Sequence, residues 1–181
     1  MKKILTISIL LHICFTAFSQ EKFFRTSKAK VKMPIVAQKL TQQELADYVK
    51  SNFKDSAIPT DAENVYKINN ILLSYWDWPV NTGEPKRTLE ERKNLTLVSY
   101  NSFNKKHGNL FKDIEANIIT VNNIKYLIDK HSYNNDVYIW FFSEDRKINS
   151  LLGLVQFSKG NETEANQVLN DFLKTVNIDN Y

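Results

Sequence analysis

The chain has little cysteine, glycine and proline for its length. Its 181 residues include one cysteine, Cys14, with four glycines and four prolines. A single cysteine excludes an intrachain disulfide, so the stability of the fold must come from packing. The sequence has no G-x-S-x-G motif, and Lys159-Gly160-Asn161 lacks the further glycines and the Lys-Ser/Thr pair of a phosphate loop. These two common catalytic and nucleotide-binding motifs are therefore absent from the sequence.

An excess of charge of one sign is also missing. There are 24 basic and 20 acidic residues, which gives a formal net charge of +4. Two of the basic residues, Lys2 and Lys3, belong to the segment that we expect to be removed, and without them the net charge falls to +2. A nearly neutral chain argues against nucleic-acid binding.

The N-terminus has the pattern of an export signal. Lys2 and Lys3 precede an apolar run from Ile4 to Phe18, and Ala17-Phe18-Ser19 offers small residues on either side of one position. This pattern predicts a cleavable signal peptide over residues 1–19, so that the mature chain begins at Gln20 and is periplasmic or secreted. An uncleaved anchor is the alternative, but it needs about 20 apolar residues. Cleavage would also remove Cys14, which leaves no thiol for catalysis.

Residues 20–40 form a basic leader before the domain. The basic residues among them that lie ahead of Pro34 are Lys22, Arg25, Lys28, Lys30 and Lys32. One interpretation is an arm that touches anionic lipid head groups, and the other is a solvated, partly disordered leader. We expect the second, because electrostatic anchoring usually needs a denser cluster or a second signal. The remaining residues, 41–181, are long enough for a single domain with a real core.

Capping residues mark the starts of three helices. Thr41 with Glu44, and Thr88 with Glu91, are capping boxes that predict helices over residues 42–54 and from 89 to about 106. We expect the second of these helices to pack through a face made of Leu89, Leu95, Val98 and Ser102. A third helix should begin after Asn161, capped by its side chain, with Glu164 in the first turn. Its apolar stripe repeats at helical spacing and comprises Ala165, Val168, Leu169, Phe172, Leu173 and Val176.

Three Asn-Asn pairs predict β-hairpins at residues 69–70, 122–123 and 134–135, because asparagine tolerates the left-handed backbone of a two-residue turn. Around the second pair, Val121 should face Ile124 and Thr120 should face Lys125. The third pair should join residues 131–133 to an aromatic strand over 136–142, with a return strand over 148–158. Both faces of these strands carry apolar residues, which predicts helices on both faces of an antiparallel sheet and an α+β fold.

This order of elements resembles the PsbP-like superfamily. The resemblance covers the helix from Leu89 and the aromatic strands from Tyr126, then the strand Leu152–Phe157, the link Lys159-Gly160-Asn161 and the closing helix to Ile178. It implies an α/β/α sandwich, and a role as an accessory subunit, adaptor or chaperone without chemistry of its own. It carries over no functional residues, since it rests on no shared site motif.

The titratable residues that stand out do not form a known motif. His107 and His131 are far apart in sequence and neither has a partner at metal-ligand spacing, so we expect no metal site. His131 should lie opposite Tyr138 with Asp129 diagonal to it, which predicts either a small polar cluster or simply a buried strand histidine. His107 precedes Gly108 and should lie at a helix end.

Two acidic pairs are the remaining candidates for catalytic carboxylates. They are Glu90-Glu91, in the first turn of a predicted helix, and Glu144-Asp145, in a predicted turn. Neighbouring residues on a helix point in different directions, and acids suit the positive end of the helix dipole. We therefore expect solvated structural roles for both pairs.

The segment Trp76-Asp77-Trp78 is the candidate binding platform. In an extended strand Trp76 and Trp78 point to the same side, so their two indoles can form a platform for a ring, a sugar or a partner's apolar side chain. The polar loop over residues 81–87 would form its rim. Burial of both rings in the core is the alternative.

Three functions remain open from these observations. The first is an exported, non-catalytic module that binds another envelope or secreted protein as an accessory, chaperone or inhibitor. The second is a carrier of a small ligand or lipid with an aromatic cleft around Trp76 and Trp78, and the third is a hydrolase without a recognisable motif. No cofactor, metal ion or nucleic acid is expected, and no transmembrane segment after signal cleavage. The absent catalytic motifs favour the first function.

Overall fold

The computed structural model describes residues 25–80, 86–146 and 148–178. The described part of the chain contains three helices and a seven-stranded sheet. In chain order the elements are β1 (Gln38–Lys39), α2 (Gln42–Asn52), β2 (Asn64–Ile68), β3 (Ile71–Pro79), α3 (Leu89–His107), β4 (Phe111–Val121), β5 (Ile124–Tyr133), β6 (Asp136–Ser143), β7 (Asn149–Ser158) and α4 (Glu162–Thr175).

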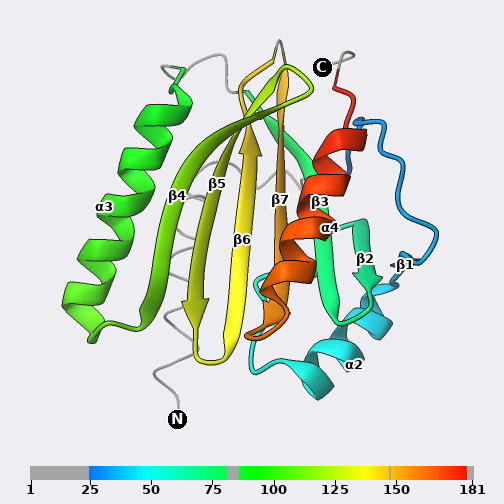
Figure 1. The fold of residues 1–181 in the computed structure, drawn as a ribbon, viewed down its shortest axis with the longest axis horizontal. Helices are drawn as coiled ribbons and strands as arrows, with labels where there is room; N and C mark the ends of the chain where they lie inside the picture. The colour runs from blue at the N-terminus through cyan, green and yellow to red at the C-terminus, as the bar shows by residue number, and fades with distance from the viewer. Residues whose placement is uncertain (1–24, 81–85, 147, 179–181) are drawn as a thin grey trace.

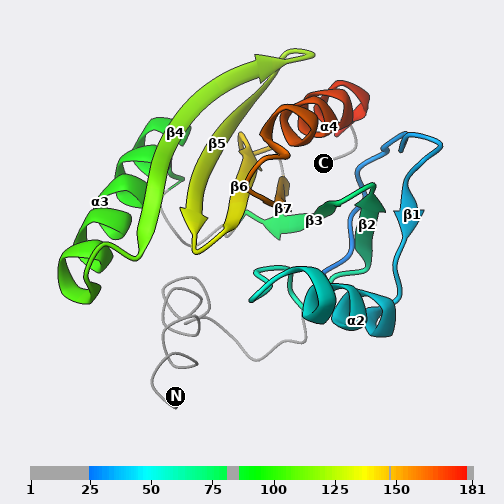
Figure 2. The same ribbon diagram turned by 60° about the horizontal axis from the view of Figure 1, so that its bottom comes forward.

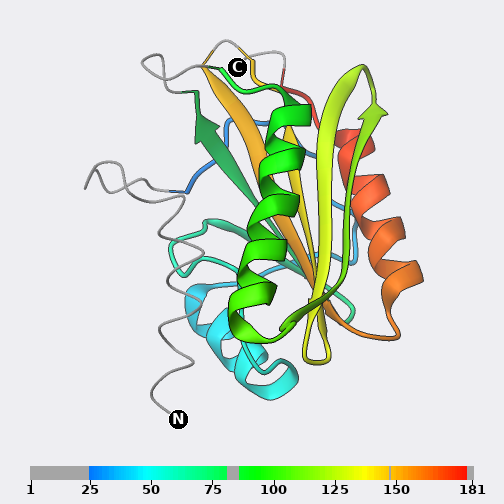
Figure 3. The same ribbon diagram turned by 90° about the vertical axis from the view of Figure 1, so that its left-hand side faces the viewer.

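The strands form one sheet in the order β1-β2-β3-β7-β6-β5-β4, and all neighbours are antiparallel. Helix α4 lies across one face of this sheet, whereas α2 and α3 lie on the other (Figures 1 and 2). Seen from the side, α3 runs alongside β4 and β5, with α4 beyond these strands (Figure 3). The predicted class, an α+β fold with helices on both faces of an antiparallel sheet, is confirmed.

Each face of the sheet has its own core. Under α4, Phe172 and Leu173 pack among residues of the central strands such as Phe141. On the opposite face, α2 packs with strand residues including Leu72 and Leu154, and α3 covers a smaller cluster around Leu127. Successive residues of a strand point alternately into the cores on the two faces. The strands therefore carry apolar residues on both faces, as their sequences predict.

Two of the three predicted helix caps have the expected geometry. The backbone N–H of Thr41 donates to Glu44 Oε2 over 2.7 Å, and that of Thr88 donates to Glu91 Oε2 over 2.7 Å, with the return bonds to both threonine hydroxyls present. The third prediction is wrong in one detail, because Asn161 occupies the N-cap of α4 but its side chain makes no capping hydrogen bond. The start of α4 depends instead on backbone bonds, such as that from Ala165 N–H to Asn161 O at 2.9 Å.

The three Asn-Asn pairs form the predicted hairpins. They connect β2 to β3, β4 to β5 and β5 to β6. The register around the second pair is as predicted, with Val121 opposite Ile124 and Thr120 opposite Lys125. Both residues of this turn, Asn122 and Asn123, have positive φ angles of 51° and 60°. Asparagine at these positions lowers the cost of a backbone that most residues avoid.

The N-terminal segment, residues 25–40, differs from the predicted leader. Arg25 forms a bridge with Ala62, and Lys30 and Asn177 exchange two backbone hydrogen bonds of 3.0 and 2.9 Å. The segment ends in β1, which pairs with β2. The folded unit that the structure describes therefore begins before Thr41, because the segment's backbone hydrogen bonds are made to the domain.

The packing face of helix α3 matches the predicted one at Leu89 but not at Leu95 and Val98. Leu89 and Tyr100 are buried, and Leu97 packs against the cluster around Leu127. Leu95 and Val98, which we expected on the packing face, are instead 47% and 61% exposed. Since α3 has apolar residues on more than one side, its sequence spacing could not determine which side faces the sheet.

Candidate functional site

Trp76 belongs to the core. It lies in β3, is 4% exposed, and meets the ring of Trp140 edge to face with 6.2 Å between centroids. The guanidinium carbon of Arg25 lies 5.5 Å from the centroid of the Trp76 ring. Trp78 is half-buried. The predicted platform of two accessible indoles is therefore not formed, because the Trp76 ring is buried.

Asp77 connects the N-terminal segment to β3 through hydrogen bonds. Its side chain accepts hydrogen bonds from Ser27 Oγ at 2.6 Å, from Lys28 N–H at 2.9 Å and from Asn149 Nδ2 at 3.5 Å. In addition, the backbone N–H of Asp77 donates to Thr26 O over 2.8 Å. The segment thus lies beside β3 at Asp77, two residues beyond Tyr75, which pairs with the first residue of β2. Of the predicted rim over residues 81–87, residues 81–85 lie outside the described part of the chain.

A polar cluster of Tyr100, Asp129 and His131 lies between α3 and β5. The Tyr100 hydroxyl is 3.0 Å from Asp129 Oδ2 and 2.7 Å from His131 Nδ1. His131 stacks on Tyr138 at 5.3 Å and meets Phe111 edge to face at 5.0 Å. The predicted proximity of His131, Tyr138 and Asp129 is correct, but the sequence pattern did not reveal Tyr100, which comes from another element.

Burial controls the charges in this cluster. It lowers the pKa of His131 from 6.5 to about 3, so the imidazole is neutral at pH 7. Burial raises the pKa of Asp129 from 3.8 to about 7, although the hydrogen bond from Tyr100 acts in the opposite direction. Burial and the nearby Asp129 carboxylate raise the pKa of Tyr100 well above its ordinary value. With Tyr100 5% exposed and His131 7% exposed, the cluster joins α3 to the sheet and offers little surface to a substrate.

Replacement of Asp129 by asparagine should change how stability depends on pH. Between pH 3.8 and about 7 only the unfolded chain ionises Asp129, so this group's contribution to stability falls as pH rises. Between about 3 and 6.5 only the unfolded chain protonates His131, so its contribution rises with pH. The two effects oppose each other in wild type. Relative to wild type, the free energy of unfolding of Asp129→Asn should therefore rise by about 1.4 kcal/mol per pH unit between pH 3.8 and 6.5.

Urea titrations at several pH values measure this slope. The control is Asp47→Asn, which makes the same change of side chain at an exposed position of α2. Parallel curves for Asp129→Asn and wild type would show that Asp129 titrates alike in the folded and unfolded chains.

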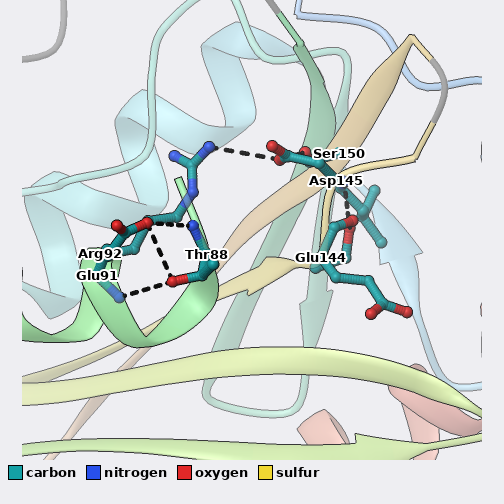
Figure 4. Close-up of polar contacts among 8 residues, drawn as sticks. Thr88, Glu91, Arg92, Glu144, Asp145 and Ser150 are labelled. Atoms are coloured by element: carbon teal, nitrogen blue, oxygen red, sulfur yellow. Dashed lines mark hydrogen bonds and ion pairs between the residues drawn. The ribbon is translucent and has the colours of Figure 1, made fainter. Parts of the chain in front are cut away.

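Asp145 takes part in a second polar network, at the N-terminal end of α3. Arg92 Nη2 lies 3.4 Å from Asp145 Oδ1, and Ser150 Oγ donates to the same oxygen over 2.6 Å (Figure 4). The Arg92 guanidinium also lies 4.4 Å from the centroid of the Phe142 ring. The side chain of Asp145 is 12% exposed, so the expectation of a solvated role is wrong for this residue.

Glu91, Glu144 and His107 make contacts that support structural roles. Glu91 caps α3, and Glu144 pairs with Arg146 over 3.1 Å. His107 is the last residue of α3 and its ring lies 4.4 Å from that of Phe103. In the described residues, no group of three or more histidine, cysteine or acidic side chains is arranged to hold a metal ion.

Two open hollows lie on the surface of the described part, and neither is lined by the tryptophans or the polar clusters. One, of about 490 Å³, lies where β1 meets α2 and is lined by residues including Leu40 and Glu63. The other, of about 590 Å³, lies between the Asn122-Asn123 turn and the end of α4, near Lys174. In the same part of the chain, no helix is both long and apolar enough to cross a membrane.

The described residues thus define an α+β protein whose antiparallel sheet is covered by helices on both faces. No family model matches this chain, and no curated protein matches its sequence. Among solved structures, it is similar to the solution structure of cyanobacterial PsbP (CyanoP) from Synechocystis sp. PCC 6803. The identity is 9% and the TM-score is 0.47, with 89% of this chain and 98% of that chain covered. At this TM-score the likeness carries no further argument, so the resemblance predicted from residues 89–178 stays a prediction, and no residue role passes from that protein to this one.

Proposed function

We propose that this chain is an exported, non-catalytic module that binds another protein through the outer side of α3. The observation that supports the proposal is the exposure of Leu95 and Val98, at 47% and 61%. They lie three residues apart and therefore share one side of the helix. Export is supported by the signal-type pattern of residues 1–19.

The charge pattern of α3 also suits a protein interface. Between Lys93 and Lys105 the helix has no charged residue, whereas both of its ends are charged. The exposed side chains beside Leu95 and Val98 include Asn94, Asn101 and other small polar residues. The centres of protein interfaces are depleted of charge, and their rims are polar. This surface is called the α3 patch below.

Two negative charges in the α3 patch should release the partner. In the double variant Leu95→Asp, Val98→Asp, the loss of apolar contact and the burial of charge should weaken binding by about 2 kcal/mol or more. Affinity purification of the tagged protein from its own envelope, with the partner quantified by mass spectrometry, measures the effect. Because both side chains are exposed, the thermal transition of the variant should stay near that of wild type.

The matched control is Asn166→Asp, Asn170→Asp, which adds the same charge to exposed positions of α4. Retention of a stoichiometric protein by wild type and by this control, but not by the α3 variant, is the expected result. Equal retention by both variants would show that α3 is not the interface. Absence of any stoichiometric protein with wild type would contradict the proposed class of function.

A further inference from the structure

The N-terminal segment presents a row of lysines on a fixed backbone. Ala29, Val31 and Met33 are half-buried and pack against the core under α4. The residues that alternate with them, Lys28, Lys30 and Lys32, are exposed. In an extended chain alternate residues point to opposite sides, so the three lysines share the outer side. The hydrogen bonds between Lys30 and Asn177 hold this row in place.

At the end of the row the chain turns and exposes two branched aliphatic side chains. Ala37 N–H donates to Pro34 O over 2.9 Å, which closes the turn. Ile35 and Val36, between these two residues, are 104% and 65% exposed. The segment that contains the turn loops out at the right-hand edge of the molecule, beyond β1 and β2 (Figure 1). Ile35 and Val36 are called the aliphatic tip below.

The charge around the aliphatic tip is entirely positive along the chain. No aspartate or glutamate occurs between Arg25 and Glu44. Arg25 pairs with Asp61 over 3.3 Å, but within the described residues no ion pair involves the four exposed lysines of this segment. These are Lys28, Lys30, Lys32 and Lys39. Their charge is therefore not neutralised by a side-chain ion pair within the described fold.

From this arrangement we infer that the segment is a peripheral membrane contact. The aliphatic tip enters the boundary between head groups and acyl chains of a bilayer, and the lysines lie against anionic head groups. Stable attachment to a membrane surface needs two signals, an apolar insertion and a basic cluster, and here both are on one segment. Because the segment is already ordered on the domain, little conformational freedom is lost on binding.

A bilayer fits these features better than a protein partner does. A stable protein interface covers about 800 Å² on each side, with a core depleted of charge and a polar rim. The segment offers instead a tip of two aliphatic residues and a row of like charges, which match a thin apolar boundary beneath a uniformly anionic layer. This inference is independent of the α3 patch, since it rests on a different element.

Vesicle co-sedimentation of the exported protein tests the inference. One set of vesicles contains phosphatidylcholine with phosphatidylglycerol, and the other contains phosphatidylcholine alone. We expect binding to the mixed vesicles that weakens with added salt, because exposed charges are screened. Ile35→Asp, Val36→Asp should reduce the binding constant about tenfold or more. Lys30→Gln, Lys32→Gln should reduce it about 25-fold, or about fivefold for each lysine.

Two matched variants serve as controls. Ile148→Asp places a charge at another exposed aliphatic residue, and Lys105→Gln, Lys106→Gln removes two exposed lysines from the end of α3. Both should bind as wild type does. The inference is overturned by equal binding to the two kinds of vesicle, by no binding to either, or by a tip variant that binds like wild type. Loss of an acidic protein from the tip variant, with vesicle binding intact, would assign the segment to a protein instead.

Discussion

Replacement of Phe172 by alanine is expected to destabilise the domain by about 3 to 5 kcal/mol. Phe172 lies on the inner side of α4 and is 2% exposed. Its ring centroid is 5.2 Å from that of Tyr75 and 5.3 Å from that of Phe141, so it contacts β3 and β6 together. The loss combines the transfer energy of the aromatic ring with the cavity left between two strands that cannot close around it. Urea denaturation followed by circular dichroism measures the change.

Asn170→Ala is the control, because Asn170 is exposed on the same helix. This substitution should change the free energy of unfolding by no more than about 0.5 kcal/mol. A Phe172→Ala variant as stable as Asn170→Ala would mean that α4 does not pack on the sheet as described.

Replacement of Gly153 by alanine should also destabilise the protein, by about 3 kcal/mol. Gly153 lies in β7 directly opposite Phe141 in β6. A Cβ at Gly153 would lie 2.0 Å from Cζ of the Phe141 ring, far inside contact distance. The ring is fully buried and is held in turn by Phe172, so it has no free space to occupy. Alanine is the better strand residue by roughly 0.5 to 1 kcal/mol, but the clash is larger and decides the sign.

A double-mutant cycle with Phe141→Leu tests this explanation by urea denaturation. Leucine is smaller than phenylalanine and leaves room for the new methyl group. The double variant Gly153→Ala, Phe141→Leu should therefore be more stable than the sum of the two single losses predicts. Additive losses would show that the cost of Gly153→Ala does not arise from the Phe141 ring.

The features that the sequence predicts correctly depend on local chemistry. A capping box such as Thr88 with Glu91 needs only residues three apart, and the Asn122-Asn123 turn sets its own register. The wrong predictions concern features that depend on contacts with distant parts of the chain. Leu95 and Leu97 are equally apolar, and only the position of the sheet determines which of them is covered. The role of Gly153 depends in the same way on a ring in the neighbouring strand.

In the candidate site too, the features set by local sequence are predicted and those set by long-range contacts are not. Hairpin register places His131 opposite Tyr138, so half of the polar cluster follows from the sequence. Tyr100 comes from α3, and its orientation toward Asp129 depends on the packing of that helix. The Arg92–Asp145 pair joins residues 53 positions apart, for which no spacing rule exists. Trp76 has the strand periodicity of a surface platform, but periodicity cannot show that Arg25 and Trp140 cover it.

The bridge between Lys30 and Asn177 has a consequence for the order in which the fold is completed. Synthesis produces Lys30 early, but its backbone partner is among the last described residues to leave the ribosome. The segment therefore stays without its final hydrogen bonds until Asn177 has been synthesised, and contacts of such long sequence separation slow folding. In a chain interrupted before Asn177, Val31 and Met33 would lack part of the surface on which they pack. The segment would then be open to proteases and to association with other unfinished chains.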